Sequence, residues 1–317
     1  AGVKATADTP FMIGSISKAV IGVTLMHAVE QGLVSLDSDV NDYLPFAVVN
    51  PRLPSHEPIT LRHLATHTSG IIDHEWHYTN SYEFGDPSVS LGTFMTDYLT
   101  ESGAAYRPSG NFAQTAPGET YEYSNIAAAL AGHVVGEATG ERLDQYAAKH
   151  LFAPLGMSNT GWFLADFEST EHLAVPYAFG NRPFPHYGYP TWPEGQLRTS
   201  ANDLARLLAA ISNGGVWGNT RILQSETVAA LLEKQSFPGL AEENGEGVFW
   251  SYTKSGLIGH NGGDYGVMSA VYFDPVQKIG LVVLTNASAE RAFGPVLSIV
   301  RQVLQGEGSG AIFAALP

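Results

Sequence analysis

The residues best suited to chemistry are Ser15 and Lys18, which stand three positions apart in the segment FMIGSISKA. Residues three apart lie on the same face of a helix, so in a helical segment the lysine amine can reach the serine hydroxyl. A serine hydroxyl is a weak nucleophile until a base removes its proton. Lysine is almost wholly protonated at neutral pH, so serving as that base requires a lowered pKa, which burial and a helix N-terminus both favour.

Two further groups follow downstream, Tyr123-Ser124-Asn125 in PGETYEYSN and His260-Asn261-Gly262 in IGHNGGDYG. Taken alone, the first is typical of a tyrosine in a turn before a capped helix, and the second of a glycine-rich bend that leads into a strand. An isolated S-x-x-K is equally typical of a capped helix with an exposed lysine. The three groups in this order predict a catalytic site built around a serine.

The elements that must position these groups can be read from the spacing of apolar residues and from capping residues. Helices are expected over 15–32, over 60–70 with Thr60 as N-cap, over 91–100, over 124–140, from there to His150 before Pro154, and over 200–215. Apart from the helix at 91–100, residues 71–118 are expected to be irregular and to cover a site. Runs 267–275 and 279–286 predict an antiparallel hairpin, followed by a closing helix over 292–305. This pattern predicts an α+β fold.

The chain resembles the serine β-lactamase and penicillin-binding protein superfamily, particularly the branch of class C β-lactamases, D-aminopeptidases and related esterases. The matching stretches are FMIGSISKA, ITLRHLATHTSGI, PGETYEYSN, GQLRTSANDLARLL and IGHNGGDYGVMSAVYFDP followed by IGLVVLTN. The resemblance implies one catalytic domain over 1–317, with an antiparallel sheet flanked by helices in about 1–60 and 215–317 and a mostly helical part in about 61–214.

The start of the chain departs from this family pattern. Relatives usually have about two strands before the S-x-x-K helix, paired with the C-terminal hairpin, whereas only 14 residues precede Ser15. The N-terminal strands are therefore expected to be short or missing, which would leave an open edge on the hairpin.

The resemblance implies that Ser15 forms an acyl-enzyme, with Lys18 and Tyr123 as the pair that handles the proton; which of the two is the base stays open. Asn125 would contact a carbonyl group of the substrate or orient Lys18. His260-Asn261-Gly262, the last of the three groups and here called the third motif, would line the substrate site with His260 and Gly262. The backbone N–H groups of Ser15 and Gly263 would form the oxyanion hole.

The third motif has histidine where many penicillin-recognising members have lysine. His260 is largely neutral at pH 7, so it is a weaker anchor for a substrate carboxylate. We therefore expect an esterase, or an amidase or peptidase that acts on D-amino-acid amides or on a peptide from its amino end, with weak β-lactamase activity at most. The alternative is a non-hydrolytic penicillin-binding or sensor protein, and an acyltransferase is a further variant.

Composition limits the partners. The net charge of −15 disfavours nucleic acid and anionic membranes, and no apolar run approaches the roughly 20 residues that span a bilayer. The absence of cysteine excludes disulfides and thiolate metal sites. The expected partner is a small ester, amide or short peptide. A soluble protein is expected, exported to the periplasm or medium rather than cytoplasmic, and the oligomeric state is left open.

A histidine-rich stretch, HTSGIIDHEWH, offers metal-ligand types at His67, His74, His77, Asp73 and Glu75. HEWH lacks the H-E-x-x-H spacing of zinc enzymes, and the serine mechanism needs no metal, so no metal or cofactor is expected. Aromatic side chains also crowd the segments around the expected pocket, where core packing is the more common role; they are Trp76, Tyr78, Tyr82, Phe84 and Trp192.

Overall fold

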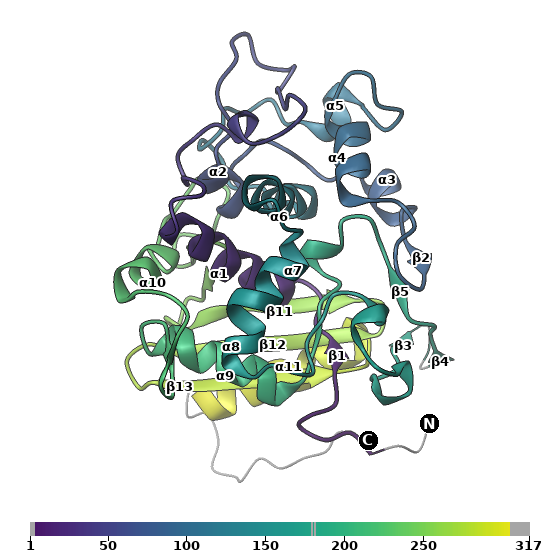
Figure 1. The fold of residues 1–317 in the computed structure, drawn as a ribbon, viewed down its shortest axis with the longest axis vertical. Coiled ribbons are helices and arrows are strands. Elements are labelled where there is room, and N and C mark those ends of the chain that lie inside the picture. Colours follow the sequence, from purple (N-terminus) through teal and green to yellow (C-terminus); the bar gives the residue numbers. More distant parts are fainter. Residues whose placement is uncertain (1–3, 179, 181, 305–317) are drawn as a thin grey trace.

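The computed structural model of the protein describes residues 4–178, 180 and 182–304. A five-stranded antiparallel sheet fills the lower half of Figure 1, helices fill the upper half, and α1 (Ile16–Glu30) runs between them. The sheet has the order β13-β12-β11-β10-β9. The predicted α+β fold, with an antiparallel sheet flanked by helices, is confirmed.

The remaining helices are α2 (Leu61–Ala65), α3 (Glu75–Thr79), α4 (Leu91–Leu99), α5 (Pro108–Asn111), α6 (Asn125–Thr139), α7 (Leu143–Ala147), α8 (Ala153–Leu155), α9 (Ala201–Ser212), α10 (Ser225–Leu231) and α11 (Ala289–Leu304). The main sheet consists of β9 (Gly245–Glu246), β10 (Ser251–Tyr252), β11 (Ile258–Asp264), β12 (Val267–Asp274) and β13 (Ile279–Thr285). Two-residue strands form four small pairs: β1 (Phe11–Met12) with β6 (Arg198–Thr199), β2 (Glu83–Phe84) with β5 (Tyr187–Gly188), β3 (Tyr177–Ala178) with β4 (Arg182–Pro183), and β7 (Val216–Trp217) with β8 (Thr220–Arg221).

Helix α1 is the centre of the molecule. Every residue from Ile16 to Met26 is buried, as expected for a helix that is apolar on nearly all sides and is surrounded by other elements. It contacts α6, α10 and β11. Any polar side chain on α1 therefore lies inside the protein and needs a partner there.

The two faces of the sheet pack against different helices. Along β12, Met268 and Ala270 point toward α11, while Val271 and Phe273 point into the main core, which follows the period of two in a strand. Helix α9 packs on β12 and β13, although it belongs to the range expected to be mostly helical. The sheet is thus covered on both faces, and β11 is held firmly beside α1.

The strand at the start of the chain does not join the main sheet. β1 is two residues long and pairs with β6, and β13 is the last strand at its side of the sheet among the described residues. Short N-terminal strands were expected, and the open edge of the hairpin lies on β13.

Four local predictions were wrong. The helix expected over 60–70 ends already at Ala65, before His67 with φ 56°. The helix expected to stop at His150 continues through a π-helical turn, Ala148–Phe152, into α8, and ends at Gly156 with φ 65°. Pro154 lies just after this π-helical turn, where the hydrogen-bond pattern of the helix changes. The segment 71–118 also forms the short helices α3 and α5 in addition to the predicted α4. The closing helix, α11, begins at Ala289; position 305, its expected end, lies outside the described residues.

Candidate active site

The site begins at the N-terminus of α1. Ser15 is the N-cap residue, but its side chain makes no capping hydrogen bond and instead accepts one from Lys18 Nζ at 3.0 Å. Gly14, with φ 56°, turns the chain into the helix. The serine is partly exposed while Lys18 is fully buried. The predicted pairing of these two side chains on one helix face is therefore present.

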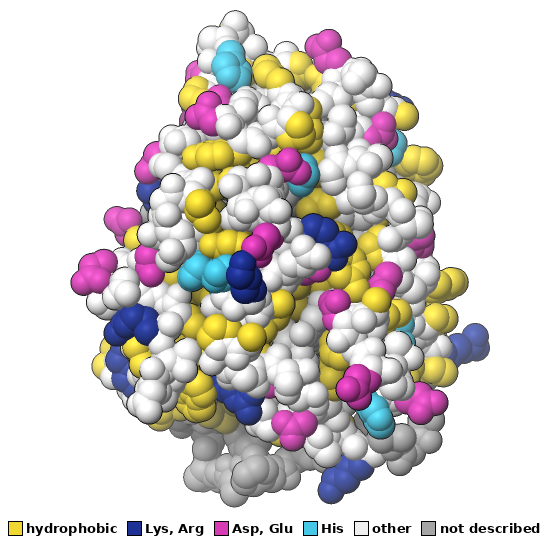
Figure 2. Space-filling model, in the orientation of Figure 1, with side chains coloured by type: hydrophobic (Ala, Val, Ile, Leu, Met, Phe, Trp, Pro, Cys, Tyr) yellow, Lys and Arg dark blue, Asp and Glu magenta, His cyan; other side chains and the backbone are white. Residues whose placement is uncertain are grey.

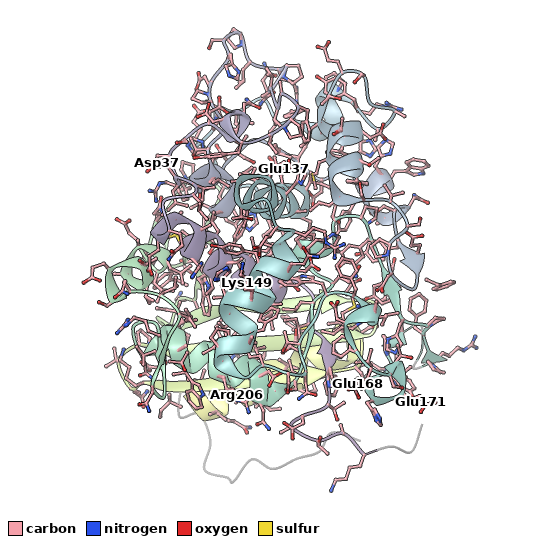
Figure 3. All side chains as sticks on the ribbon, in the orientation of Figure 1. Asp37, Glu137, Lys149, Glu168, Glu171 and Arg206 are labelled. Atoms are coloured by element: carbon pink, nitrogen blue, oxygen red, sulfur yellow. The ribbon has the colours of Figure 1, made fainter. Side chains whose placement is uncertain are left out.

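Lys18 is held by four acceptors. Besides Ser15, its Nζ donates to Asn125 Oδ1 at 2.6 Å, to the backbone oxygen of Glu194 at 3.0 Å and to Glu194 Oε2 at 2.9 Å. Charged side chains labelled in Figure 3, such as Asp37, Glu137 and Lys149, are exposed. In contrast, the side chains of Lys18 and Glu194 are 0% and 2% exposed and form a buried ion pair.

Glu194 was missed by the sequence analysis. It lies directly before the quoted stretch GQLRTSANDLARLL, and it is the one acidic or basic residue in the aromatic run YGYPTWPEGQL. A lone carboxylate in such an uncharged, aromatic segment needs a partner once it is buried. This is the signal by which the sequence could have identified Glu194.

The ion pair with Glu194 changes the pKa of Lys18. Burial lowers the pKa of Lys18, but Glu194 and Tyr123 outweigh burial, and the net pKa lies above its ordinary value. This is opposite to the lowering that a lysine base requires. Lys18 is therefore an ammonium group in the resting site.

Tyr123 precedes α6 and lies beside the Ser15–Lys18 pair. Lys18 Nζ is 5.0 Å from the centre of the Tyr123 ring, and interaction of the Tyr123 hydroxyl with Lys18 and Ser15 acts to lower the pKa of Tyr123. Burial of the hydroxyl raises the pKa of Tyr123, and the ammonium of Lys18 only partly offsets this rise. The residue as a whole is 37% exposed, so a substrate can reach it.

The N-terminus of α6 fixes Tyr123 and Asn125 in place. Asp73 accepts hydrogen bonds from Ser124 Oγ at 2.8 Å and from the backbone N–H groups of Asn125 and Ile126 at 2.9 and 3.0 Å. These bonds satisfy donors that a helix leaves free at its start. Asn125 Oδ1, which accepts from Lys18 Nζ, is fixed in this way, and its role in orienting Lys18 stays a prediction.

A neutral histidine supports the ring of Tyr123. His67 has φ 56°, its Nδ1 accepts from the N–H of Ser124 at 3.2 Å, and its ring centre is 4.4 Å from that of Tyr123. Burial, with Lys18 nearby, lowers the pKa of His67 well below its ordinary value. Its ring therefore packs under the tyrosine in neutral form.

Strand β11 forms the opposite wall. A side-chain carbon at Gly14 would lie 2.9 Å from the backbone N of Gly263, and one at Gly262 would lie 1.9 Å from the oxygen of Ile13. Strand and helix therefore approach closely only because these residues are glycines. Among the described residues, β10 pairs with β11 only at Ile258 and Gly259, so the following edge of β11 is open toward the site.

His260 stands on this strand, 4% exposed, with its ring centre 6.4 Å from that of Tyr123. Burial and the positive charge of Lys18 lower the pKa of His260 to about 4. The third motif therefore carries no positive charge at neutral pH.

The segment 71–118 covers the site with two tyrosines. Tyr78 donates to Glu194 Oε1 at 2.6 Å, and Tyr82 Oη lies 3.3 Å from Asp264 Oδ2. The other aromatic residues considered lie elsewhere: Trp76 and Phe84 are 63% and 70% exposed, and Trp192 is buried against Trp162. Tyr82 also lines a cavity of about 910 Å³ next to α4, whose walls do not include Ser15.

Some residues of the histidine-rich stretch have structural roles. Asp73 caps α6, His67 packs under Tyr123, and the rings of His74 and His77 lie 4.9 Å apart. Within the described ranges, no three histidine or acidic residues come together as metal ligands would. Acidic and basic side chains are dispersed over the face shown in Figure 2. In the same part of the chain, no helix has the length and apolar character needed to cross a bilayer.

The comparisons with known proteins agree with this fold. The model of the family described as Beta-lactamase matches residues 1–303. Protein flp of Staphylococcus aureus (strain MW2) is 26% identical over 303 residues, which is 91% of this chain and 55% of that protein. The chain thus spans about half the length of this relative.

Two solved structures have the same fold. The D-amino acid amidase from Ochrobactrum anthropi SV3 matches with a TM-score of 0.73 and 24% identity, over 96% of this chain and 88% of that one. The β-lactamase/D-alanine carboxypeptidase from Pseudomonas syringae matches with a TM-score of 0.73 and 18% identity, over 97% and 87% of the two chains.

Proposed function

This chain belongs to the β-lactamase family, and we propose that it is a serine hydrolase that cleaves esters or amides through an acyl-enzyme on Ser15. The observation that carries the proposal is the contact of Ser15 Oγ with Lys18 Nζ at 3.0 Å, next to the hydroxyl of Tyr123. A nucleophile within hydrogen-bonding reach of groups that move a proton is the arrangement that covalent catalysis requires.

Tyr123 moves the proton. Lys18 is already protonated because of Glu194, so it has no free lone pair for the proton of Ser15. As the Ser15 oxygen bonds to the substrate carbonyl carbon, its proton passes to the ionised form of Tyr123, a minor form at neutral pH because its pKa is raised. The resulting phenol then gives this proton to the leaving nitrogen or oxygen, whose bond to carbon breaks. The ammonium of Lys18 stabilises negative charge on the phenol oxygen during this exchange.

The backbone N–H groups of Ser15 and Gly263 bind the carbonyl oxygen as it becomes negative. In enzymes with such a site, one donor is worth about two to three powers of ten in rate. The close approach of Gly14 to Gly263 supports this assignment, because it brings the two donors to one place. Water then releases the acyl group by the same proton route in reverse.

The substrate is an ester, a D-amino-acid amide or a peptide cut from its amino end. The neutral His260 supports this class, since a substrate carboxylate beside the scissile bond would find no positive charge there. The similarity to a D-amino acid amidase supports it as well. Deacylation separates this hydrolase from a penicillin-binding sensor that acylates and stops.

The test combines intact-mass measurement with turnover of a nitrophenyl ester, a D-alanyl amide and a penicillin. We expect a transient adduct and turnover in the wild type, and neither in Ser15→Ala. Ser225→Ala, at an exposed serine on α10, serves as the matched control and should behave as the wild type. A stable adduct without turnover would support the sensor, and activity that survives in Ser15→Ala would refute the proposal.

A further inference from the structure

A second carboxylate, that of Asp264, lies at the end of β11, one residue after Gly263. Its Oδ1 accepts from the N–H of Tyr265 at 2.7 Å, and its Oδ2 lies 3.3 Å from Tyr82 Oη and 3.4 Å from Tyr189 Oη. None of the ion pairs found in the described part of the chain includes Asp264. The carboxylate is thus held by phenol and amide donors, without a cation.

Four tyrosines from three segments surround this carboxylate; we call Tyr82, Tyr187, Tyr189 and Tyr265 the tyrosine cage. The ring centres of Tyr82 and Tyr189 are 4.5 Å apart, those of Tyr82 and Tyr265 5.8 Å, and those of Tyr187 and Tyr265 6.2 Å. Tyr187 and Tyr189 are buried, Tyr82 is half-buried and Tyr265 is 39% exposed. Tyr82 and Tyr265 are therefore the two rings of the cage that a cation reaches from solvent, and an aromatic ring face attracts a cation.

The cage is connected to the catalytic pair. Tyr78 donates to Glu194 at 2.6 Å, and its hydroxyl is 3.5 Å from that of Tyr82, which reaches Asp264. The buried ammonium of Lys18 pairs with Glu194 and not with Asp264. Burial, with the negative charge of Glu194 nearby, raises the pKa of Asp264 to about 7. A cation beside Asp264 would oppose this rise in its pKa, because a nearby positive charge favours the ionised carboxylate.

We propose that Asp264 and the tyrosine cage form a subsite for a protonated amine on the acyl part of the substrate. The subsite rests on the proposed function, because this amine belongs to the acyl group that Ser15 receives. The Cα atoms of Gly263 and Asp264 are about 3.8 Å apart, so the carboxylate lies within a few bonds of a carbonyl bound at Gly263. The substrates are therefore esters or amides of an amino acid with a free amino group.

The test uses two substrates that differ in one group. D-Alanine 4-nitroanilide carries an ammonium where isobutyric 4-nitroanilide carries a methyl group. At pH 7, where an α-amino group is mainly protonated, we expect a ratio of kcat/KM for the two of about ten or more. Asp264→Asn should lower this ratio about tenfold or more, since a hydrogen bond to a charged group is lost. Glu226→Gln, at an exposed carboxylate on α10, is the matched control for net charge and should keep the ratio.

An unchanged ratio in Asp264→Asn, or a wild type with no preference for the ammonium, would overturn the subsite while leaving a Ser15-dependent hydrolase intact. If the protein shows no turnover, binding measurements distinguish the subsite proposal from the hydrolase proposal. In Ser15→Ala, calorimetry should show D-alaninamide binding about tenfold or more tightly than isobutyramide, and Asp264→Asn should remove the difference. Equal binding of the two amides would refute the subsite, whatever the fate of the hydrolase. Tyr82→Phe removes a hydrogen-bond donor but keeps the ring, so it should retain part of the preference for the ammonium. This variant keeps the proposal testable if Asp264→Asn does not fold.

Discussion

Replacing Glu194 by glutamine tests which group accepts the proton of Ser15. The substitution keeps the shape of the side chain and removes the charge that lies 2.9 Å from Lys18 Nζ. Loss of one partner of a buried ion pair typically costs about 3–5 kcal/mol. Lys18 can avoid this cost by releasing its proton, so its pKa must fall in the variant. The amine would then be neutral at pH values at which the wild type is charged.

The size of the effect follows from the position of Lys18 beside Tyr123. A unit charge about 5 Å from another contributes about 3 kcal/mol at an effective dielectric constant of about 20. Nζ is 5.0 Å from the centre of the tyrosine ring, so the loss of its charge should remove stabilisation of this order from the phenolate-like oxygen. About 3 kcal/mol corresponds to about two powers of ten in rate.

The assay is the pH profile of kcat/KM on a nitrophenyl ester. We expect Glu194→Gln to be about a hundredfold less active wherever Lys18 is neutral, and the alkaline limb of its profile to move to lower pH. Glu246→Gln is the matched control: this carboxyl is equally buried, and burial raises its pKa to about 8, so it is mainly neutral at pH 7. Its profile should match that of the wild type. A Glu194→Gln enzyme more active than the wild type near neutral pH would refute the reasoning and make the amine of Lys18 the base.

Three further substitutions test other parts of the site. Tyr123→Phe should lower kcat on the ester by about two to four powers of ten, the usual range for general acid–base groups, and a loss below about threefold would place proton transfer elsewhere. His260→Lys should raise the rate of acylation by a penicillin, measured by intact mass, about tenfold or more because it adds a charged donor; unchanged penicillin and ester rates would disprove the role of charge. Asp73→Ala should lower the free energy of unfolding in urea by about 1–2 kcal/mol through loss of the α6 cap, and equal stability would contradict that.

The sequence predicted the parts of the site that depend on local structure. The contact between Ser15 and Lys18 follows from helical spacing, and Ser124 caps α6 as the segment YSN suggests. The β12–β13 hairpin, which pairs with the strand that carries the third motif, follows from two apolar runs joined by a short turn. In each case the information lies within a few residues along the chain.

The sequence did not predict contacts between distant segments. Glu194 reaches Lys18 across 176 positions, and Tyr82 reaches Asp264 across 182 positions, so no spacing rule connects them. The protonation of Lys18 depends on the first of these contacts, which outweighs the lowering of its pKa by burial. Helix spacing shows that a lysine can touch a serine, but its charge is decided by whatever else is buried beside it.

The arrangement of charge along β11 links the substitutions at His260 and Asp264. Residues at intervals of two share one face of a strand, so His260, Gly262 and Asp264 line the same face of β11. Where many penicillin-recognising members have a lysine, this face has a histidine whose pKa burial lowers to about 4. Four residues further on, it has a carboxylate inside the tyrosine cage. The face that would receive a substrate carboxylate in those members therefore has the opposite preference here, and it favours a substrate that carries an ammonium group.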